Sequence, residues 1–135
     1  MSVRVYQSGG RFEEAASYAR AKRVGPFVYI AGTTAIEPTG KIHAPYDVYA
    51  QSTYILGRIE EFLKEVGAER RHVMRSRCYL PDLSQAAGLV KAHGAFFAGI
   101  MPAMTAVEAK LTQDGLMVEI DVDAIVHDPT GQISF

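Results

Sequence analysis

Residues 47–80, DVYAQSTYILGRIEEFLKEVGAERRHVMRSRCYL, contain a helix followed by a strand, and this pair decides how the rest of the chain can fold. Within Val48–Val66 the apolar residues recur at helical spacing, with Asp47 as a candidate N-cap and Gly67 where the helix ends. His72–Leu80 alternates like a strand with one buried face. We expect its core face to carry Met74, Ser76, Cys78 and Leu80, and its other face to carry Val73, Arg75, Arg77 and Tyr79.

The residues before the helix predict extended structure. Val3–Tyr6 has the pattern of a short strand, and Tyr18–Val24 and Phe27–Thr33 form a predicted hairpin around Gly25-Pro26. The first elements of the chain are therefore strands.

A second helix and two strands are predicted after residue 80. Asp82–Gln85 resembles a capping box, and Thr105–Ala109 and Met117–His127 have the composition of strands. One side of the helix is predicted to carry Ala86, Leu89, Val90, His93, Phe96 and Phe97. In the last strand Val118, Ile120, Val122 and Ala124 form the apolar face, and Glu119, Asp121 and Asp123 form the opposite one.

This order of elements predicts an α+β fold, a mixed β-sheet with two helices on one face. A chain of 135 residues is long enough for one core, so we expect a single domain over residues 1–135. The uncovered face would carry both charged and apolar side chains. A symmetric oligomer that closes such faces on one another would explain this pattern.

Composition narrows the function. The 14 Lys+Arg against 15 Asp+Glu give a formal charge of -1, which offers no basic field for a nucleic-acid backbone. No apolar run is long enough to span a membrane, and the first ten residues lack the apolar core of a signal peptide, so we expect a cytoplasmic protein. The four histidines and the single Cys78 show no metal-ligand spacing, and we expect neither a metal nor a cofactor.

An ordered set of short motifs resembles the YjgF/RidA family. The resemblance covers about residues 12–127 and is carried by Tyr18–Gly25, Phe27–Gly32, Pro38–Gly40, Phe96-Phe97, Pro102-Ala103 and Val118–Ile120. It implies a chorismate-mutase-like fold, and a homotrimer whose sheets form a central barrel. It also implies a small-molecule site in each cleft between subunits.

The resemblance further implies a cofactor-free hydrolysis of reactive enamines and imines, such as 2-aminoacrylate. The family's site tyrosine matches Tyr18, its ligand-facing backbone matches Ala31 and Gly32, and its carboxylate matches Glu119. We expect Glu119 to act as a general acid or base, and the alternative is a structural ion pair with Arg75 or Arg77. For Tyr18 the alternatives are orienting the substrate and packing as a half-buried side chain.

One departure from the family puts its best-known activity in doubt. The family's deaminases hold the substrate carboxylate with the arginine of a Pro-Ala-Arg-x-Cys pattern, whereas residues 102–106 here read Pro-Ala-Met-Thr-Ala. Met104 and Ala106 thus replace the arginine and the cysteine, and Met104 and Thr105 occupy the substrate-binding segment. Because methionine cannot pair with a carboxylate, we expect a poor 2-iminoacid deaminase. Arg20 or Arg77 could supply a replacement cation.

Three functions remain open from the sequence. The first is a cofactor-free hydrolase or deaminase for an imine-like or other small unsaturated metabolite. The second is a module that binds or senses a small molecule without chemistry. The third, an RNA endonuclease, is disfavoured by the near-neutral charge.

Overall fold

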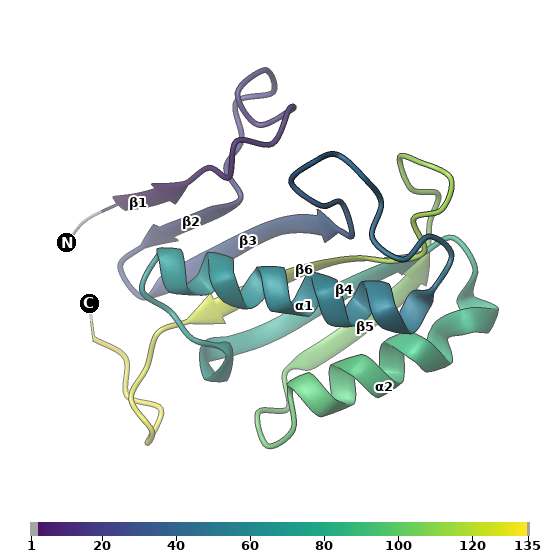
Figure 1. Cartoon of the computed structure of the whole chain (residues 1–135). Coiled ribbons are helices and arrows are strands. Elements are labelled where there is room, and N and C mark those ends of the chain that lie inside the picture. The colour runs from purple at the N-terminus through teal and green to yellow at the C-terminus, as the bar shows by residue number, and fades with distance from the viewer. Residues whose placement is uncertain (1–2, 135) are drawn as a thin grey trace.

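The computed structural model describes residues 3–134 and contains six strands and two α-helices (Figure 1). Two short 3₁₀ turns, Arg70–His72 and Leu83–Gln85, precede β4 and α2. The elements are β1 Val3–Tyr6, β2 Ala21–Val24, β3 Phe27–Thr34, α1 Val48–Glu65, β4 Val73–Leu80, α2 Ala86–Phe96, β5 Ala103–Glu108 and β6 Glu119–Ile125.

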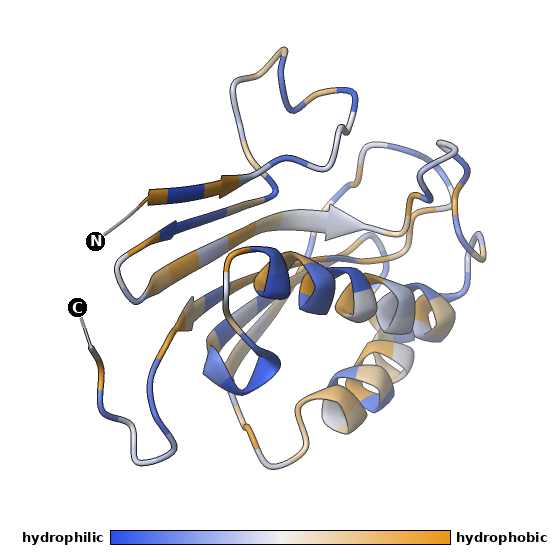
Figure 2. Ribbon diagram, turned by 60° about the vertical axis from the view of Figure 1, so that its left-hand side comes forward, coloured by the Kyte–Doolittle hydropathy of each residue, from blue (hydrophilic) through white to orange (hydrophobic). Residues whose placement is uncertain are grey.

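The strands form one mixed sheet in the order β1-β2-β3-β6-β4-β5. Neighbouring strands are antiparallel except β4 and β5, which are parallel and joined through α2. Both helices lie on the same face of the sheet (Figures 1 and 2), and the side of α1 that faces the sheet is apolar. The predicted α+β fold, a mixed sheet with two helices on one face, is confirmed.

Helix α1 follows the predicted pattern closely. The Asp47 side chain caps it by accepting a hydrogen bond from the Ala50 amide at 3.0 Å, and Gly67 follows its end with a φ of +77°. The side of the helix that faces the sheet is fully buried and includes Ile55, Ile59 and Leu63. Burial of this stripe supplies most of the contact between α1 and the sheet.

The core face of β4 differs from the prediction at its first two residues. Val73 pairs with Ala124 and Arg75 pairs with Asp123, so Met74 is the extra residue of a β-bulge. The bulge reverses the order of buried and exposed side chains in the part of β4 that precedes Arg75. Val73 is therefore buried, and Met74, predicted to face the core, is 50% exposed.

Beyond the bulge the predicted core face is confirmed. Ser76, Cys78 and Leu80 are buried, and the Ser76 hydroxyl lies 2.8 Å from Nε2 of the buried His93 on α2. Burial raises the pKa of the Cys78 thiol to about 12, which makes it an inert, small apolar side chain.

Two further predictions need correction. Val90 is 61% exposed, because it is turned by about 100° from Leu89, at the edge of the narrow buried stripe of α2. Strand β2 begins at Ala21 rather than Tyr18, since Ser17 has a φ of +59° and the Tyr18 amide donates to the Glu13 carbonyl within a turn. Strand β5 begins two residues earlier and ends one residue earlier than predicted, and β6 is two residues shorter at each end.

The face of the sheet opposite the helices is open and mixed in character. An apolar row crosses four neighbouring strands at one end of this face, and it consists of Val3, Val24, Phe27 and Ile125. The centre of the face carries charged side chains. At the far edge, all six residues of β5 are exposed. In the described part of the chain, no helix is long and apolar enough to cross a membrane.

Candidate functional site

Glu119 opens β6 on the open face of the sheet and lies directly against Gly32 of β3. A Cβ on residue 32 would overlap Oε2 of Glu119, so the glycine leaves the space that the carboxyl group occupies. Glu119 is only partly exposed. The carboxyl group thus packs closely against the backbone of β3 at Gly32.

A β-bulge at Ala31 and Gly32 shapes the wall next to this carboxyl group. Ile30 pairs with Val122 and Thr33 with Ile120, so β3 has one residue more than β6 between these pairs. The Ala31 amide donates to the Arg20 carbonyl at 3.0 Å, and the Ala31 carbonyl accepts from the Thr33 hydroxyl at 2.9 Å. The bulge is therefore fixed by its own hydrogen bonds.

The surroundings of Glu119 shift the pKa of its carboxyl group. Burial raises the pKa of Glu119 above its ordinary value, and repulsion from Asp121 raises it further. The nearby Arg20 guanidinium acts in the opposite direction but does not cancel these effects. A raised pKa brings a carboxyl group closer to the neutral range in which general acids and bases act.

Arg20 lies beside this carboxyl group but is already engaged. Its Nη1 donates to the Gly32 carbonyl at 3.0 Å, and its Nε lies 3.8 Å from Oε2 of the buried Glu13. The guanidinium carbon also lies 5.2 Å from the centre of the Tyr18 ring. Arg20 therefore joins Tyr18 and Gly32 to the N-terminal loop.

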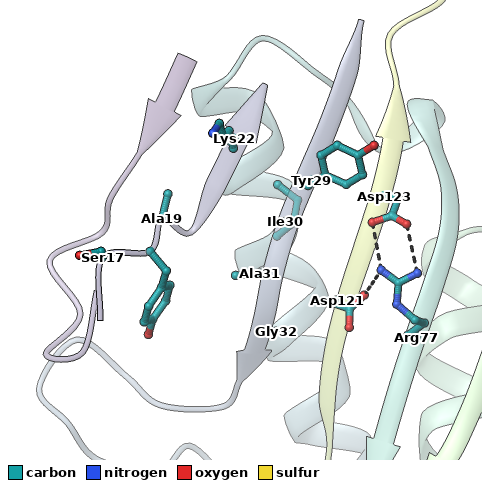
Figure 3. A pocket seen from close by; sticks show the side chains of 11 residues that line it. Ser17, Ala19, Lys22, Tyr29, Ile30, Ala31, Gly32, Arg77, Asp121 and Asp123 are labelled. Atoms are coloured by element: carbon teal, nitrogen blue, oxygen red, sulfur yellow. Dashed lines mark hydrogen bonds and ion pairs between the residues drawn. The ribbon is translucent and has the colours of Figure 1, made fainter. Parts of the chain in front are cut away.

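An open hollow of about 450 Å³ lies beside these residues (Figure 3). Tyr18, which is 38% exposed, lines it together with Ala31, Gly32 and Arg77. The other lining residues are Ser17, Ala19, Lys22, Tyr29, Ile30, Asp121 and Asp123. The structure thus brings four of the predicted site residues to one hollow, and Glu119 and Arg20 adjoin it at Gly32.

Arg77 is held by carboxylates other than Glu119. It donates two hydrogen bonds to Asp123, each of 3.1 Å, and its Nη2 lies 2.8 Å from Asp121, as Figure 3 shows. The Tyr79 hydroxyl donates to the same Asp121 at 2.9 Å. The ion pair considered between Glu119 and Arg77 is not formed in this structure; Arg77 pairs with the two aspartates instead.

Met104 and Thr105 lie away from the hollow. Both are on β5, with β6 and β4 between that strand and β3. Thr105 pairs with Arg77 and Met104 with Ser76, so the two side chains point to opposite sides of the sheet edge. Within one chain neither residue lines the hollow.

Sequence reasoning missed the part that Glu13 and the aspartates play. Asp121 and Asp123 were placed on the correct face, but their pairing with Arg77 depends on the register of β4 against β6. Glu13 gave no recognisable pattern, because it sits in a loop and its partners are mostly backbone amides. Among residues 3–134, no group of three His, Cys, Asp or Glu side chains is arranged to hold a metal ion.

Comparison with known proteins identifies the family. The family model described as Endoribonuclease L-PSP matches residues 9–126. The chain belongs to the YjgF/RidA family. A crystal structure of a YjgF/YER057c/UK114 family member from Mycobacterium tuberculosis has a TM-score of 0.83 and 38% identity, covering 93% of this chain and 100% of that one.

Relatives of known and unknown activity occur within this YjgF/RidA family. A RutC family protein of Pyrococcus abyssi is 31% identical over 79% of this chain and 84% of its own length. The 2-iminobutanoate/2-iminopropanoate deaminase of Mus musculus is 25% identical, with 80% of each chain covered. Some members are therefore imine deaminases, and family membership alone does not assign that activity to this chain.

Proposed function

We propose that this YjgF/RidA protein is a cofactor-free hydrolase for a small imine-like, enamine-like or otherwise unsaturated metabolite. The observation that carries the proposal is the Glu119 carboxyl group, which is partly buried, has a raised pKa and lies against Gly32 beside an open hollow. Tyr18 and the backbone at Ala31 and Gly32 form the adjoining wall. This arrangement supports proton transfer to and from a bound molecule.

In the proposed chemistry Glu119 both donates and accepts a proton. In its acid form it donates a proton to the nitrogen of a C=N bond, which makes the bonded carbon electrophilic. A water molecule adds to that carbon and returns a proton to Glu119. The resulting carbinolamine then loses ammonia, so that C=N and water become C=O and NH₃.

The preferred substrate is not expected to be a simple 2-imino acid. Such a substrate carries a carboxylate, for which a guanidinium is the natural partner. Met104 occupies the position of the family's arginine, and Arg20 and Arg77 are both engaged by acidic or carbonyl groups of the protein. We therefore expect a substrate held without a strong carboxylate clamp.

We further propose that the site is completed by a neighbouring copy in a homotrimer. The apolar row on the open face and the exposed β5 edge support this assembly, because both would be buried by partner chains. The assembly would also bring Met104 and Thr105 of one copy toward the hollow of the next. Light scattering at micromolar concentration should give about three times 14.8 kDa, and a stable monomer would contradict the proposal.

The Glu119→Gln variant tests the catalytic proposal. We expect it to abolish imine hydrolysis while it changes the melting temperature by only a few degrees, because glutamine keeps the shape of the side chain. Imines generated by an amino-acid oxidase and by an amine oxidase supply the substrates, and release of the carbonyl product is followed. The matched control is Glu65→Gln at an exposed position of α1, which should retain full activity.

If Glu119 instead forms a structural ion pair across a subunit boundary, the same variant should lose about 3–5 kcal/mol of stability. Loss of stability with unchanged turnover would overturn the catalytic role.

Binding without chemistry is the second candidate. It is favoured by the Ala31 amide, which already donates to the Arg20 carbonyl and so is not a spare donor for a transition state. A thermal-shift screen with carbonyl and amine metabolites separates the two functions. Stabilisation by a ligand that is never converted would support the binding module.

A further inference from the structure

Arg20 has the environment of a fixed structural cation rather than a ligand-binding one. Its side chain is only 15% exposed: Nη1 donates to the Gly32 carbonyl, and the guanidinium lies over the Tyr18 ring. Its buried Nε has no hydrogen-bond partner within the residues that the structure describes and lies 3.8 Å from the Glu13 carboxylate, close enough for an ion pair. A guanidinium with these contacts cannot swing toward a ligand without breaking them. Contacts within the protein, rather than a bound ligand, therefore set the position of the Arg20 guanidinium next to Glu119.

Glu13 is itself anchored more firmly than any other carboxylate near the site. It is 3% exposed and accepts hydrogen bonds from the Ser8 amide at 2.9 Å, the Ser8 hydroxyl at 2.6 Å and the Gly10 amide at 3.1 Å. A Cβ on residue 10 would overlap Glu13 Oε2, so Gly10 permits this close approach. The N-terminal loop is thus built around one buried carboxylate that faces Arg20.

We infer that Glu13 and Arg20 form a positioning pair for Glu119. Glu13 holds the guanidinium in place, and Arg20 fixes the Gly32 carbonyl and keeps a positive charge beside the Glu119 carboxyl group. The inference rests on the proposed function in that it takes Glu119 as the acid–base group. It assigns Arg20 to positioning rather than to substrate binding.

The charges around Glu119 give Arg20 a specific effect. From β6, Asp121 disfavours the ionised form of Glu119, and from β4 the neighbouring Tyr79 and Arg77 are both bound to Asp121. From β3, Gly32 and Thr34 adjoin Glu119 and carry no charge. Arg20 is the cation that counteracts burial and Asp121, so removal of its charge should raise the pKa of Glu119 further.

Titration of the Glu119 carboxyl group by ¹³C NMR tests this inference directly, with the resonance assigned from Glu119→Gln. We expect Arg20→Gln to raise the pKa of Glu119 by about one unit, and Arg20→Lys to retain part of the effect of the charge. The matched control is Arg11→Gln, which removes a positive charge from the exposed part of the same loop and should leave the titration unchanged.

The Glu13→Gln variant separates positioning from simple charge effects. If Glu13 holds Arg20 in place, its replacement releases the guanidinium and the pKa of Glu119 rises. If Glu13 acts only as a distant negative charge, its removal makes the pKa fall. A fall, or no change, would overturn the part assigned to Glu13.

Two further measurements keep the test decisive. If Arg20→Gln does not fold because Glu13 is left unpaired, the double variant Glu13→Gln/Arg20→Gln removes both charges and should still raise the pKa of Glu119. An unchanged pKa in the folded variants would overturn the inference. If wild-type protein converts no imine but the titration shifts as expected, the positioning pair stands and the proposed function fails.

Discussion

At position 32 the absence of a side chain is what allows the acid–base group to reach its place. We predict that Gly32→Ala displaces the Glu119 carboxyl group, since the new methyl group would overlap it. Activity should fall about 100-fold, the cost typical of a misplaced catalytic group. The displaced atoms are the end of a flexible side chain, so the free energy of unfolding should change by less than about 1 kcal/mol.

Gly57→Ala on α1 is the control for this change. A Cβ at residue 57 meets nothing within 4 Å, so alanine should leave activity intact. It should raise the free energy of unfolding by up to about 1 kcal/mol through its higher helix propensity. Equal loss of activity in both variants would contradict the explanation given for Gly32.

His72 should make the protein less stable in mild acid. Burial, and then repulsion from Arg71, lower the pKa of His72 below its ordinary value, and its Nδ1 accepts a hydrogen bond from the Glu69 amide at 3.0 Å. The folded protein therefore binds this proton less readily than the unfolded chain. The stabilisation is complete above about pH 6.5 and is lost as the pH falls toward the lowered pKa.

Urea unfolding at pH 7 and pH 5 measures this effect. His72→Asn keeps an acceptor for the Glu69 amide without a titrating group, so its loss of stability between the two pH values should be smaller than that of the wild type. Burial lowers the pKa of His93 as well, and His93 should account for part of the remaining loss. An equal loss in wild type and variant would exclude His72 as a source.

At the scale of elements, the capping interaction of α1 offers a direct test. Asp47→Ala removes the acceptor for the Ala50 amide and should lower the free energy of unfolding by about 1 kcal/mol. Asp47→Asn should retain most of the stability, because asparagine is an equally good N-cap. If both variants lose the same amount, the carboxylate charge, and not the hydrogen bond, is responsible.

The elements were predictable where a pattern extends over several residues. Helix α1 and the apolar face of β6 follow from repeated spacing, and their predicted positions are confirmed. Met74 could not be placed, because the bulge in β4 depends on which residues of β6 lie opposite. The ion pairs of Arg77 could not be predicted either, because they depend on the pairing of distant strands, which leaves no local pattern in the sequence.

The candidate site, too, was predictable only in part from the sequence. The positions of Tyr18, Ala31, Gly32 and Glu119 came from the family resemblance, and the structure brings them together around one bulge. The anchoring of Arg20 by Glu13 could not be predicted, because it joins a loop to the sheet through backbone amides. Their roles in catalysis stay predictions until the variants are measured.

The whole molecule also makes a prediction about position 104. In the proposed trimer Met104 would approach the cleft of a neighbouring copy, so Met104→Arg should create a partner for a substrate carboxylate. We expect hydrolysis of 2-iminopropanoate to increase about 10- to 100-fold, equivalent to about 1.5–3 kcal/mol for a charge-assisted hydrogen bond. Product release from oxidase-generated imine measures the rate.

Met74→Arg is the control, because it places the same side chain at another exposed methionine. It should leave the rate unchanged. A similar gain in both variants would indicate a general effect of positive charge and would contradict the placement of Met104 near the cleft.

The single cysteine allows opening of the protein interior to be measured by thiol labelling. Cys78 is 1% exposed between the sheet and the helices, so a thiol reagent can reach it only when that layer opens. The labelling rate, compared with that of the unfolded chain, therefore gives the free energy of this opening without any engineered probe. A cysteine introduced on the open face would in turn be the one readily labelled thiol, suitable for a fluorophore that follows ligand binding.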